Sequence, residues 1–226
     1  MSLGGGRVVA GQSKASEVEA TTAPVAPRPG RRERNKQEKL ARIVAAARQL
    51  FRERGFAETT TQQIAETADI GTGTLFLYAR CKEDLLVLVF RDEMLETART
   101  AFASVQAEAS LLDQLMQVFT CMLDYHEQDP DIARILLKEI AVPNAAGHPA
   151  DISELLSVIF SGLADLVIAA RAAGRLASEA PPLLVAENLF ANYYLGLLGW
   201  VGGRTTRQQF LDRLRRLLAI TIQSAV

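Results

Sequence analysis

Apolar residues recur at steps of three and four along most of the chain, which is the pattern of amphipathic helices. The first such run begins at Asn35 or Lys36 and ends at Gly55, since a glycine that follows basic residues is typical of a helix C-terminus. Further helices are predicted over residues 82–107, 111–127, 130–142, 152–173, 181–200 and 205–223. We therefore expect an all-α fold.

A different pattern occupies residues 59–82, between the first two long helices. An inward stripe that includes Ile64 marks a short helix, and Leu75 anchors a second one. The turn between them contains Asp69 and Gly71, because Asp tolerates turn geometry and Gly adopts positive φ without steric cost. Two short helices joined by such a turn make a helix-turn-helix.

The surface of this helix-turn-helix carries the residues that we expect to contact DNA. Its second helix presents hydroxyls and aromatic or apolar groups, which suit base edges, thymine methyls and phosphates in a major groove. At the start of its first helix, a hydroxyl and free N–H groups can hold a phosphate, with Thr59 or Thr60 as the cap. The predicted contacts are Thr59, Thr60, Thr61, Thr72, Gly73, Thr74, Phe76, Leu77, Tyr78 and Lys82.

Lys and Arg outnumber Asp and Glu across residues 28–42, just before the helix-turn-helix. Beside such a motif, this charge predicts phosphate contact or insertion into the minor groove. Arg31, Arg32 and Arg34 are the leading candidates. A solvated tail without a role in binding is the alternative.

The order of residues from 64 to 86 resembles the DNA-binding signature of TetR-type (tetracycline-repressor-like) transcriptional regulators. That signature reads I-A-x-x-A-G-V-S-x-G-T-L-Y-x-Y-F-x-S-K-E-x-L. The chain carries IAE at 64–66, ADI at 68–70, GTLFLY at 73–78 and KEDLL at 82–86. It departs from the signature at Asp69, Gly71, Phe76, Ala79 and Cys81.

The resemblance implies an N-terminal three-helix helix-turn-helix DNA-binding domain over residues 31–81 and a C-terminal helical ligand-binding and dimerisation domain over 82–226. It also implies a dimer on a near-palindromic double-stranded operator, and a small-molecule effector that shifts the spacing of the two DNA-binding heads. Such regulators more often repress than activate transcription, and the sequence does not decide between the two. Residues 1–30 are rich in Gly, Ser, Ala, Thr and Pro and are expected to form a disordered leader.

Large, adaptable side chains on the helices of the second domain are candidates for the effector pocket. They are Phe102, Met116, Phe119, Met122, Tyr125, Phe160, Tyr193 and Trp200. Because few charges lie among them, an apolar or aromatic effector is favoured. The same helical spacing also suits plain hydrophobic core, which is the alternative for each residue.

The last two predicted helices are apolar on two sides, so each needs a covering surface besides its own domain. We predict a two-fold homodimer with a four-helix interface, and a larger monomeric core is the alternative. The predicted interface residues are Leu189, Gly196, Gly199, Phe210, Leu214, Leu217 and Leu218.

Cys81 stands where the signature has a capping Ser. The helix N-terminus and the flanking Arg80 and Lys82 are expected to lower the pKa of its thiol, which would permit a redox-sensing role. An inert replacement for Ser is the alternative. His126 and His148 have no ligand cluster nearby and are expected at the surface or in loops, so no metal and no cofactor are predicted.

The sequence carries none of the motifs that would indicate an enzyme. The chain has 226 residues, of which 49% are hydrophobic, and a formal net charge of -1. It shows no phosphate-binding Gly loop, nucleophile elbow, metal-ligand spacing or His-centred triad, so we do not expect an enzyme. A helical interaction protein without specific DNA binding is the first alternative, and a small-molecule enzyme is the second. No signal peptide is recognised, and every uncharged stretch is shorter than the roughly 20 residues that a membrane span needs. We therefore expect a cytoplasmic protein with no membrane contact.

Overall fold

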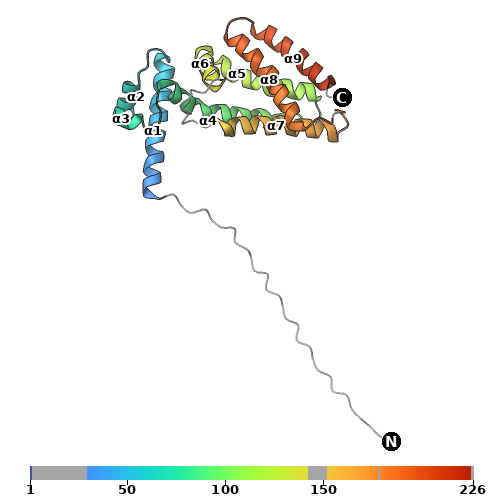
Figure 1. The fold of residues 1–226 in the computed structure, drawn as a ribbon, viewed down its shortest axis with the longest axis horizontal. Coiled ribbons are helices and arrows are strands. Elements are labelled where there is room, and N and C mark those ends of the chain that lie inside the picture. Colours follow the sequence, from blue (N-terminus) through green and yellow to red (C-terminus); the bar gives the residue numbers. More distant parts are fainter. Residues whose placement is uncertain (2–29, 142–151, 178, 225–226) are drawn as a thin grey trace.

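The computed structural model describes residues 1, 30–141, 152–177 and 179–224, and every regular element within them is a helix (Figure 1). This confirms the predicted all-α fold. The helices are α1 (Arg31–Arg54), α2 (Thr61–Thr67), α3 (Thr72–Leu75), α4 (Lys82–Ala103), α5 (Leu111–Glu127), α6 (Pro130–Ala141), α7 (Ser153–Ala172), α8 (Pro182–Val201) and α9 (Arg207–Ser224). The predicted leader, apart from its two ends, lies outside the described residues.

The first three helices form a small domain at one end of the molecule, with α2 and α3 lying beside α1 (Figure 1). Ile43 and Phe51 of α1, Ile64 of α2 and Leu75 of α3 are all buried in its core. Ala79 is also buried, in the place where the family signature has a large ring. The half-buried ring of Phe56 lies 5.3 Å from that of Phe51, centroid to centroid, so this neighbouring ring adds to the core of the small domain.

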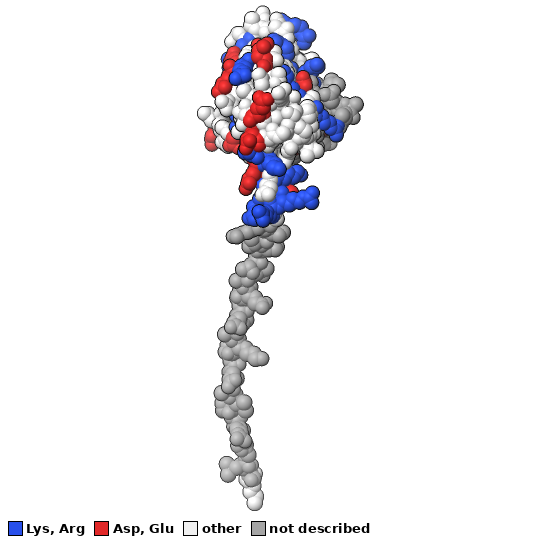
Figure 2. Space-filling model, turned by 90° about the vertical axis from the view of Figure 1, so that its left-hand side faces the viewer, with Lys and Arg blue, Asp and Glu red and all other residues white. Residues whose placement is uncertain are grey.

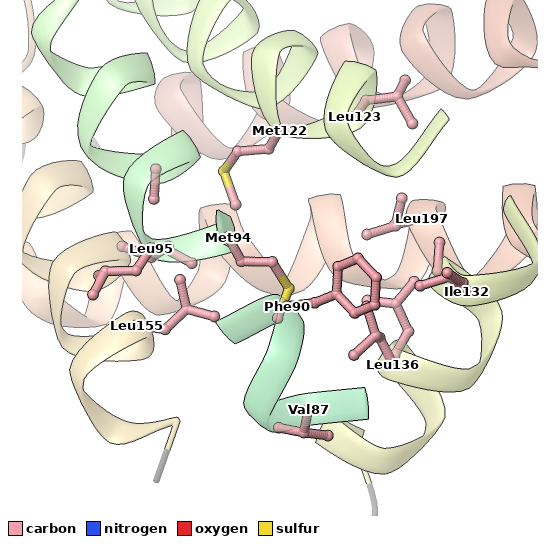
Figure 3. Close-up of a cluster of buried hydrophobic side chains, with 14 of the residues drawn as sticks. Val87, Phe90, Met94, Leu95, Met122, Leu123, Ile132, Leu136, Leu155 and Leu197 are labelled. Carbon is pink, nitrogen blue, oxygen red and sulfur yellow. The ribbon is translucent and has the colours of Figure 1, made fainter. Parts of the chain in front are cut away.

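Helix α4 belongs to both parts of the molecule. Every residue from 85 to 90 is buried, and a helix that is apolar all round must be covered on all sides. It packs against α1 of the small domain and against α5, α6 and α7 of the bundle. Figure 3 shows Phe90 and Met94 of α4 pointing into a cluster that includes Met122, Leu136 and Leu197 from three other helices.

The pairs α7–α8 and α8–α9 form the rest of the bundle (Figure 1). Leu189, Phe210, Leu214 and Leu218, which we predicted in the dimer interface, are buried within this single chain. That prediction is therefore wrong for these four side chains, because the apolar face that seemed to need a partner is covered by the protein's own helices. Gly196 and Leu217 are half-buried, whereas Leu195, which lines the same groove, is 65% exposed.

Two element boundaries differ clearly from the sequence expectation. Helix α1 begins at Arg31 rather than at Asn35 or Lys36, and α4 ends at Ala103 rather than near residue 107. Thr205 or Thr206 was predicted to cap the last helix, and it is Thr206 whose hydroxyl accepts a hydrogen bond from the N–H of Gln209 at 3.2 Å. Among the described helices, α7 alone has the length and apolar composition to span a membrane, and it packs against α4 and α8 in the bundle.

Replacing Gly196 by Ala should destabilise the bundle. A Cβ at this position would lie 2.2 Å from the nearest carbon of the buried Phe210 ring. The resulting overpacking, roughly 1–3 kcal/mol, outweighs the gain of about 1 kcal/mol in helix propensity. Urea unfolding at one fixed protein concentration measures the change. The control is Gly73→Ala, where a Cβ meets nothing within 4 Å, and equal stability of the two variants would contradict the prediction.

Candidate nucleic-acid interface and ligand cavity

The turn between α2 and α3 aims the second helix outward from the small domain. Asp69 adopts a φ of 52°, a left-handed conformation that Asp tolerates better than most residues. The N–H of Ile70 then donates to the carbonyl of Ala65 at 3.0 Å, which closes the end of α2. Gly71 precedes α3 without a side-chain cap, as expected for a glycine at this position.

The outer side of α3 and the residues just after it expose apolar groups. Leu75 is fully buried, but its neighbours Phe76 and Leu77 are 47% and 82% exposed. Thr72 and Gly73 are exposed beside them, and Thr74 is half-buried. This surface of methyl, ring and hydroxyl groups can contact base edges and thymine methyls in a major groove.

Two of the predicted contact residues are already engaged within the small domain. The hydroxyl of Tyr78 donates to the carbonyl of Lys36 at 3.5 Å, which joins the end of the helix-turn-helix to α1. The ammonium of Lys82 donates to the carbonyls of Phe56 and Ala57 at 2.6 and 3.1 Å. Lys82 therefore holds the α1–α2 loop onto the start of α4, a structural role that the sequence did not reveal.

The three threonines before α2 have different positions. The Thr59 side chain is buried and donates to the carbonyls of Leu50 and Gly55, so its predicted role as a DNA contact is wrong. Thr60 is the N-cap, and its hydroxyl accepts from the N–H of Gln63 in a reciprocal capping box. Thr61 is half-buried at the first position of α2.

The basic segment forms the first turns of α1 rather than an extended arm. Arg31, Arg32, Arg34, Lys36 and Lys39 are all exposed there. Figure 2 shows Lys and Arg gathered at this end of α1. A helix end with this charge can lie along phosphates next to a groove occupied by α3.

Two adjoining cavities lie along α4 and α5, and the first of them also reaches α1 of the small domain. The first, which we call the junction cavity, has a volume of about 310 Å³ and lies between α1, α4, α5 and α6. The second, the apolar slot, has about 40 Å³ and lies between α4, α5, α6, α7 and α8. Tyr125 and His126 line both, so these two residues stand where the cavities meet.

The structure brings only some of the predicted pocket residues together. Met122, Tyr125 and Tyr193 line the apolar slot, and the Phe119 ring stacks behind Tyr193 at 4.6 Å. Phe160 meets Phe190 edge to ring at 5.4 Å.

The other predicted pocket residues pack elsewhere. The Phe102 ring lies against Gly162 of α7, and Met116 and Trp200 are half-buried against the core. Slot residues that the sequence analysis missed are Met94, Thr97, His126, Leu137, Leu155, Leu156, Ile159, Phe190, Tyr194 and Leu197. Helical periodicity marks these residues as inward, but it carries no signal that separates a cavity wall from packed core.

His126 is buried in α5, so the expectation of a surface histidine is wrong for this residue. Its Nδ1 has no hydrogen-bond partner among the described residues, and burial lowers the pKa of its imidazole to about 4. The buried hydroxyl of Tyr193 likewise lacks a partner there. His148 lies outside the described residues.

Glu93 of α4 connects the two domains at the junction cavity. Its carboxylate pairs with the guanidinium groups of Arg48 and Arg52 on α1, each at 3.1 Å. It also accepts a hydrogen bond from the hydroxyl of Tyr125 on α5 at 3.3 Å. One side chain of the cavity wall therefore contacts both α1 and α5.

Comparison with known proteins agrees with this arrangement of the first four helices. Residues 43–89 match the family model described as bacterial regulatory proteins, tetR family. The helix-turn-helix segment of this chain is therefore similar to that of tetR-family regulators.

Curated relatives match this chain over about half of its length. It is 30% identical over 120 residues to YvkB, an uncharacterised HTH-type transcriptional regulator of Bacillus subtilis, a match that covers 51% of this chain and 62% of that protein. It is 24% identical to the fatty acid metabolism regulator protein of the same organism, over 49% of this chain and 57% of that protein. The matches thus span less than two thirds of either relative.

Solved structures share the fold of this chain over most of its length. The repressor FadR of Thermus thermophilus, in complex with lauroyl-CoA, superposes with a TM-score of 0.63 at 22% identity, over 83% of this chain and 95% of that one. FadR of Bacillus subtilis, in complex with stearoyl-CoA, gives a TM-score of 0.58 at 20% identity, over 82% and 98%.

Cys81 departs from the TetR signature without becoming reactive. Its sulfur caps α4 by accepting from the N–H of Asp84 at 3.4 Å. Burial, together with the nearby Asp84 and Glu83 carboxylates, raises the pKa of the thiol. The expected lowering is therefore wrong, which favours an inert substitute for Ser. Within the described residues, no group of His, Cys, Asp and Glu is placed to hold a metal ion.

Acid should destabilise this protein through His126. Burial lowers its pKa from 6.5 to about 4, so between these pH values the unfolded chain binds a proton that the folded chain does not. The free energy of unfolding should therefore fall as the pH drops from 6.5 to 4, by about 3 kcal/mol, with no further loss from this group below pH 4. Urea unfolding at several pH values measures the slope. His126→Phe should flatten it, and parallel slopes for the two proteins would refute the assignment.

Proposed function

We propose that this protein is a ligand-responsive, DNA-binding transcriptional regulator that acts as a cytoplasmic homodimer, most simply as a repressor. The observation that carries the proposal is the double role of α4. Its first half is buried against α1 of the helix-turn-helix domain, and its second half lines the cavities of the bundle. Occupancy of a cavity and orientation of the DNA-binding domain thus depend on the same helix.

On DNA, α3 of each protomer would enter a major groove, and the basic end of α1 would contact the neighbouring phosphates. The exposed Phe76 and Leu77 would read base edges, with Thr72 and Gly73 beside them. Two-fold symmetry would require half-sites about 34–36 Å apart, or a multiple of this, and hence a near-palindromic operator.

The proposed dimer surface is the outward side of α8 and α9. A groove of about 400 Å³ there is lined by Leu195, Gly196, Gly199 and Leu217, with Arg204 and Arg213 among its polar residues. Leu195 and Ile220 are 65% and 57% exposed on these two helices. Apolar side chains that project beside a groove suit contact with a second copy of the same surface.

The proposed effector has a long apolar part that enters the slot. The slot is lined by aliphatic and aromatic side chains, including Met94 and Met122, which adapt their shape easily. The similar FadR structures were solved with lauroyl-CoA and stearoyl-CoA. Long-chain acyl-CoA thioesters are therefore the first ligands to test for release of DNA.

Leu77→Ala should weaken specific DNA binding about tenfold, because it removes the most exposed apolar group of the proposed reading surface. Fluorescence anisotropy with labelled duplexes from the DNA flanking its own gene, and with random DNA across a salt series, measures this. Random-sequence binding should change little, since phosphate contacts carry it.

The matched control for this measurement is Ile168→Ala, which truncates an exposed side chain on α7, far from the helix-turn-helix. It should bind the flanking DNA like the wild type. If both variants lose the same affinity for the flanking DNA, or if Leu77→Ala loses affinity for random DNA alone, α3 does not read the DNA sequence.

Leu195→Lys should convert the dimer to monomers, since a cation would be buried at the proposed interface in the groove that Arg204 and Arg213 already line. Sedimentation equilibrium at micromolar protein measures the mass. Ile168→Lys on α7 is the control and should leave the dimer intact. If Ile168→Lys dissociates the protein and Leu195→Lys does not, the interface lies on α7 instead.

A further inference from the structure

The junction cavity has a chemistry different from that of the apolar slot. We propose that it binds an uncharged hydrogen-bonding group of an amphipathic effector, such as a carbonyl or hydroxyl, which His126 contacts while the apolar tail enters the slot. We further propose that this group acts on the DNA-binding domain through the Glu93–Arg52 pair. The inference rests on the proposed function and specifies the ligand class and the route of regulation.

His126 fixes where the polar group of the ligand would lie. The residue lines both cavities, and its Nδ1 is buried without a partner among the described residues. A buried nitrogen of this kind lowers stability unless something binds to it. A neutral imidazole offers one donor and one acceptor, so it can pair with either a carbonyl or a hydroxyl.

The charges around the junction cavity argue for a neutral group. The Arg52 guanidinium is already paired with Glu93 at 3.1 Å. The carboxylate of Asp129, also in the wall, accepts from the N–H of Ile132 at 3.0 Å and caps α6. With one paired cation and two carboxylates in the described wall, a ligand carboxylate would meet repulsion rather than a counter-ion.

The position of Arg52 supplies the route to DNA. Arg52 belongs to α1, the longest helix of the small domain, yet its side chain lines the cavity. Glu93 holds it and also accepts from Tyr125, which stands at the mouth of the slot. A ligand that fits only one arrangement of these three side chains must bind the DNA-free and DNA-bound states unequally, which is the requirement for regulation.

Binding of matched probes tests the proposed ligand class. Lauroyl-CoA and 1-dodecanol carry an uncharged polar group at the end of a twelve-carbon chain, whereas dodecanoate carries a charge there. Isothermal titration at pH 7.5 with the full chain should show at least tenfold tighter binding of dodecanol than of dodecanoate. His126→Phe should weaken dodecanol and lauroyl-CoA binding about tenfold.

His126→Phe should at the same time raise the melting temperature of the protein without a probe. A residue needed only for structure would lower it. Tighter binding of dodecanoate than of dodecanol, unchanged affinity in His126→Phe, or no binding of any of the three probes to the wild type would each overturn the inference. Operator binding by the same wild-type sample would show that the DNA-binding part of the proposed function survives that failure.

Glu93→Gln and Tyr125→Phe test the route of regulation. In the wild type, saturating lauroyl-CoA should change the dissociation constant for operator DNA at least tenfold. In both variants, the dissociation constants for operator DNA with and without lauroyl-CoA should differ by less than threefold. Glu96→Gln, a nearby exposed carboxylate of α4, is the control and should keep the wild-type ratio. A wild-type ratio in Glu93→Gln would remove the Glu93–Arg52 pair from the route.

Discussion

The structure depends on the complete burial of the first half of α4. Residues 85–90 are apolar around the whole helix, so a domain that packs against one side of the helix cannot cover all of them. The small domain covers one side through α1, and the bundle covers the others through α5, α6 and α7. Because burial of apolar surface drives both packings, the two domains cannot separate without exposing this segment to water. Their relative orientation can therefore change only by small adjustments at the same contacts.

Polar contacts at this junction limit which adjustments of the two domains are possible. The carboxylate of Glu93 is shared between two arginines of α1 and a tyrosine of α5, and Arg48 also donates to the carbonyl of Val89 at 3.2 Å. A partly buried carboxylate with several partners has few alternative arrangements of similar energy. Two discrete arrangements, rather than a continuum, are what a switch between two DNA-binding states requires.

The sequence predicted local features far better than shared surfaces. Ile64, Leu75 and the turn at Asp69 were recognisable because caps, turns and short-range spacing depend on neighbouring residues. Leu189 and Phe210 were placed in the wrong surface, since an inward stripe does not say whether the covering helix belongs to the same chain. His126 lines cavities whose walls also come from α4 and α8, which are distant in the sequence, so no local pattern could reveal its burial.

The small volume of the apolar slot has a consequence for the speed of the response. A space of about 40 Å³ holds no more than a few water molecules, far less than a long alkyl chain. Entry therefore requires Met94, Met122 and the surrounding helices to move apart first. Association would then be limited by the frequency of opening rather than by diffusion, and dissociation would be slow for the same reason. Such a regulator would respond to sustained changes in effector concentration and average over brief ones.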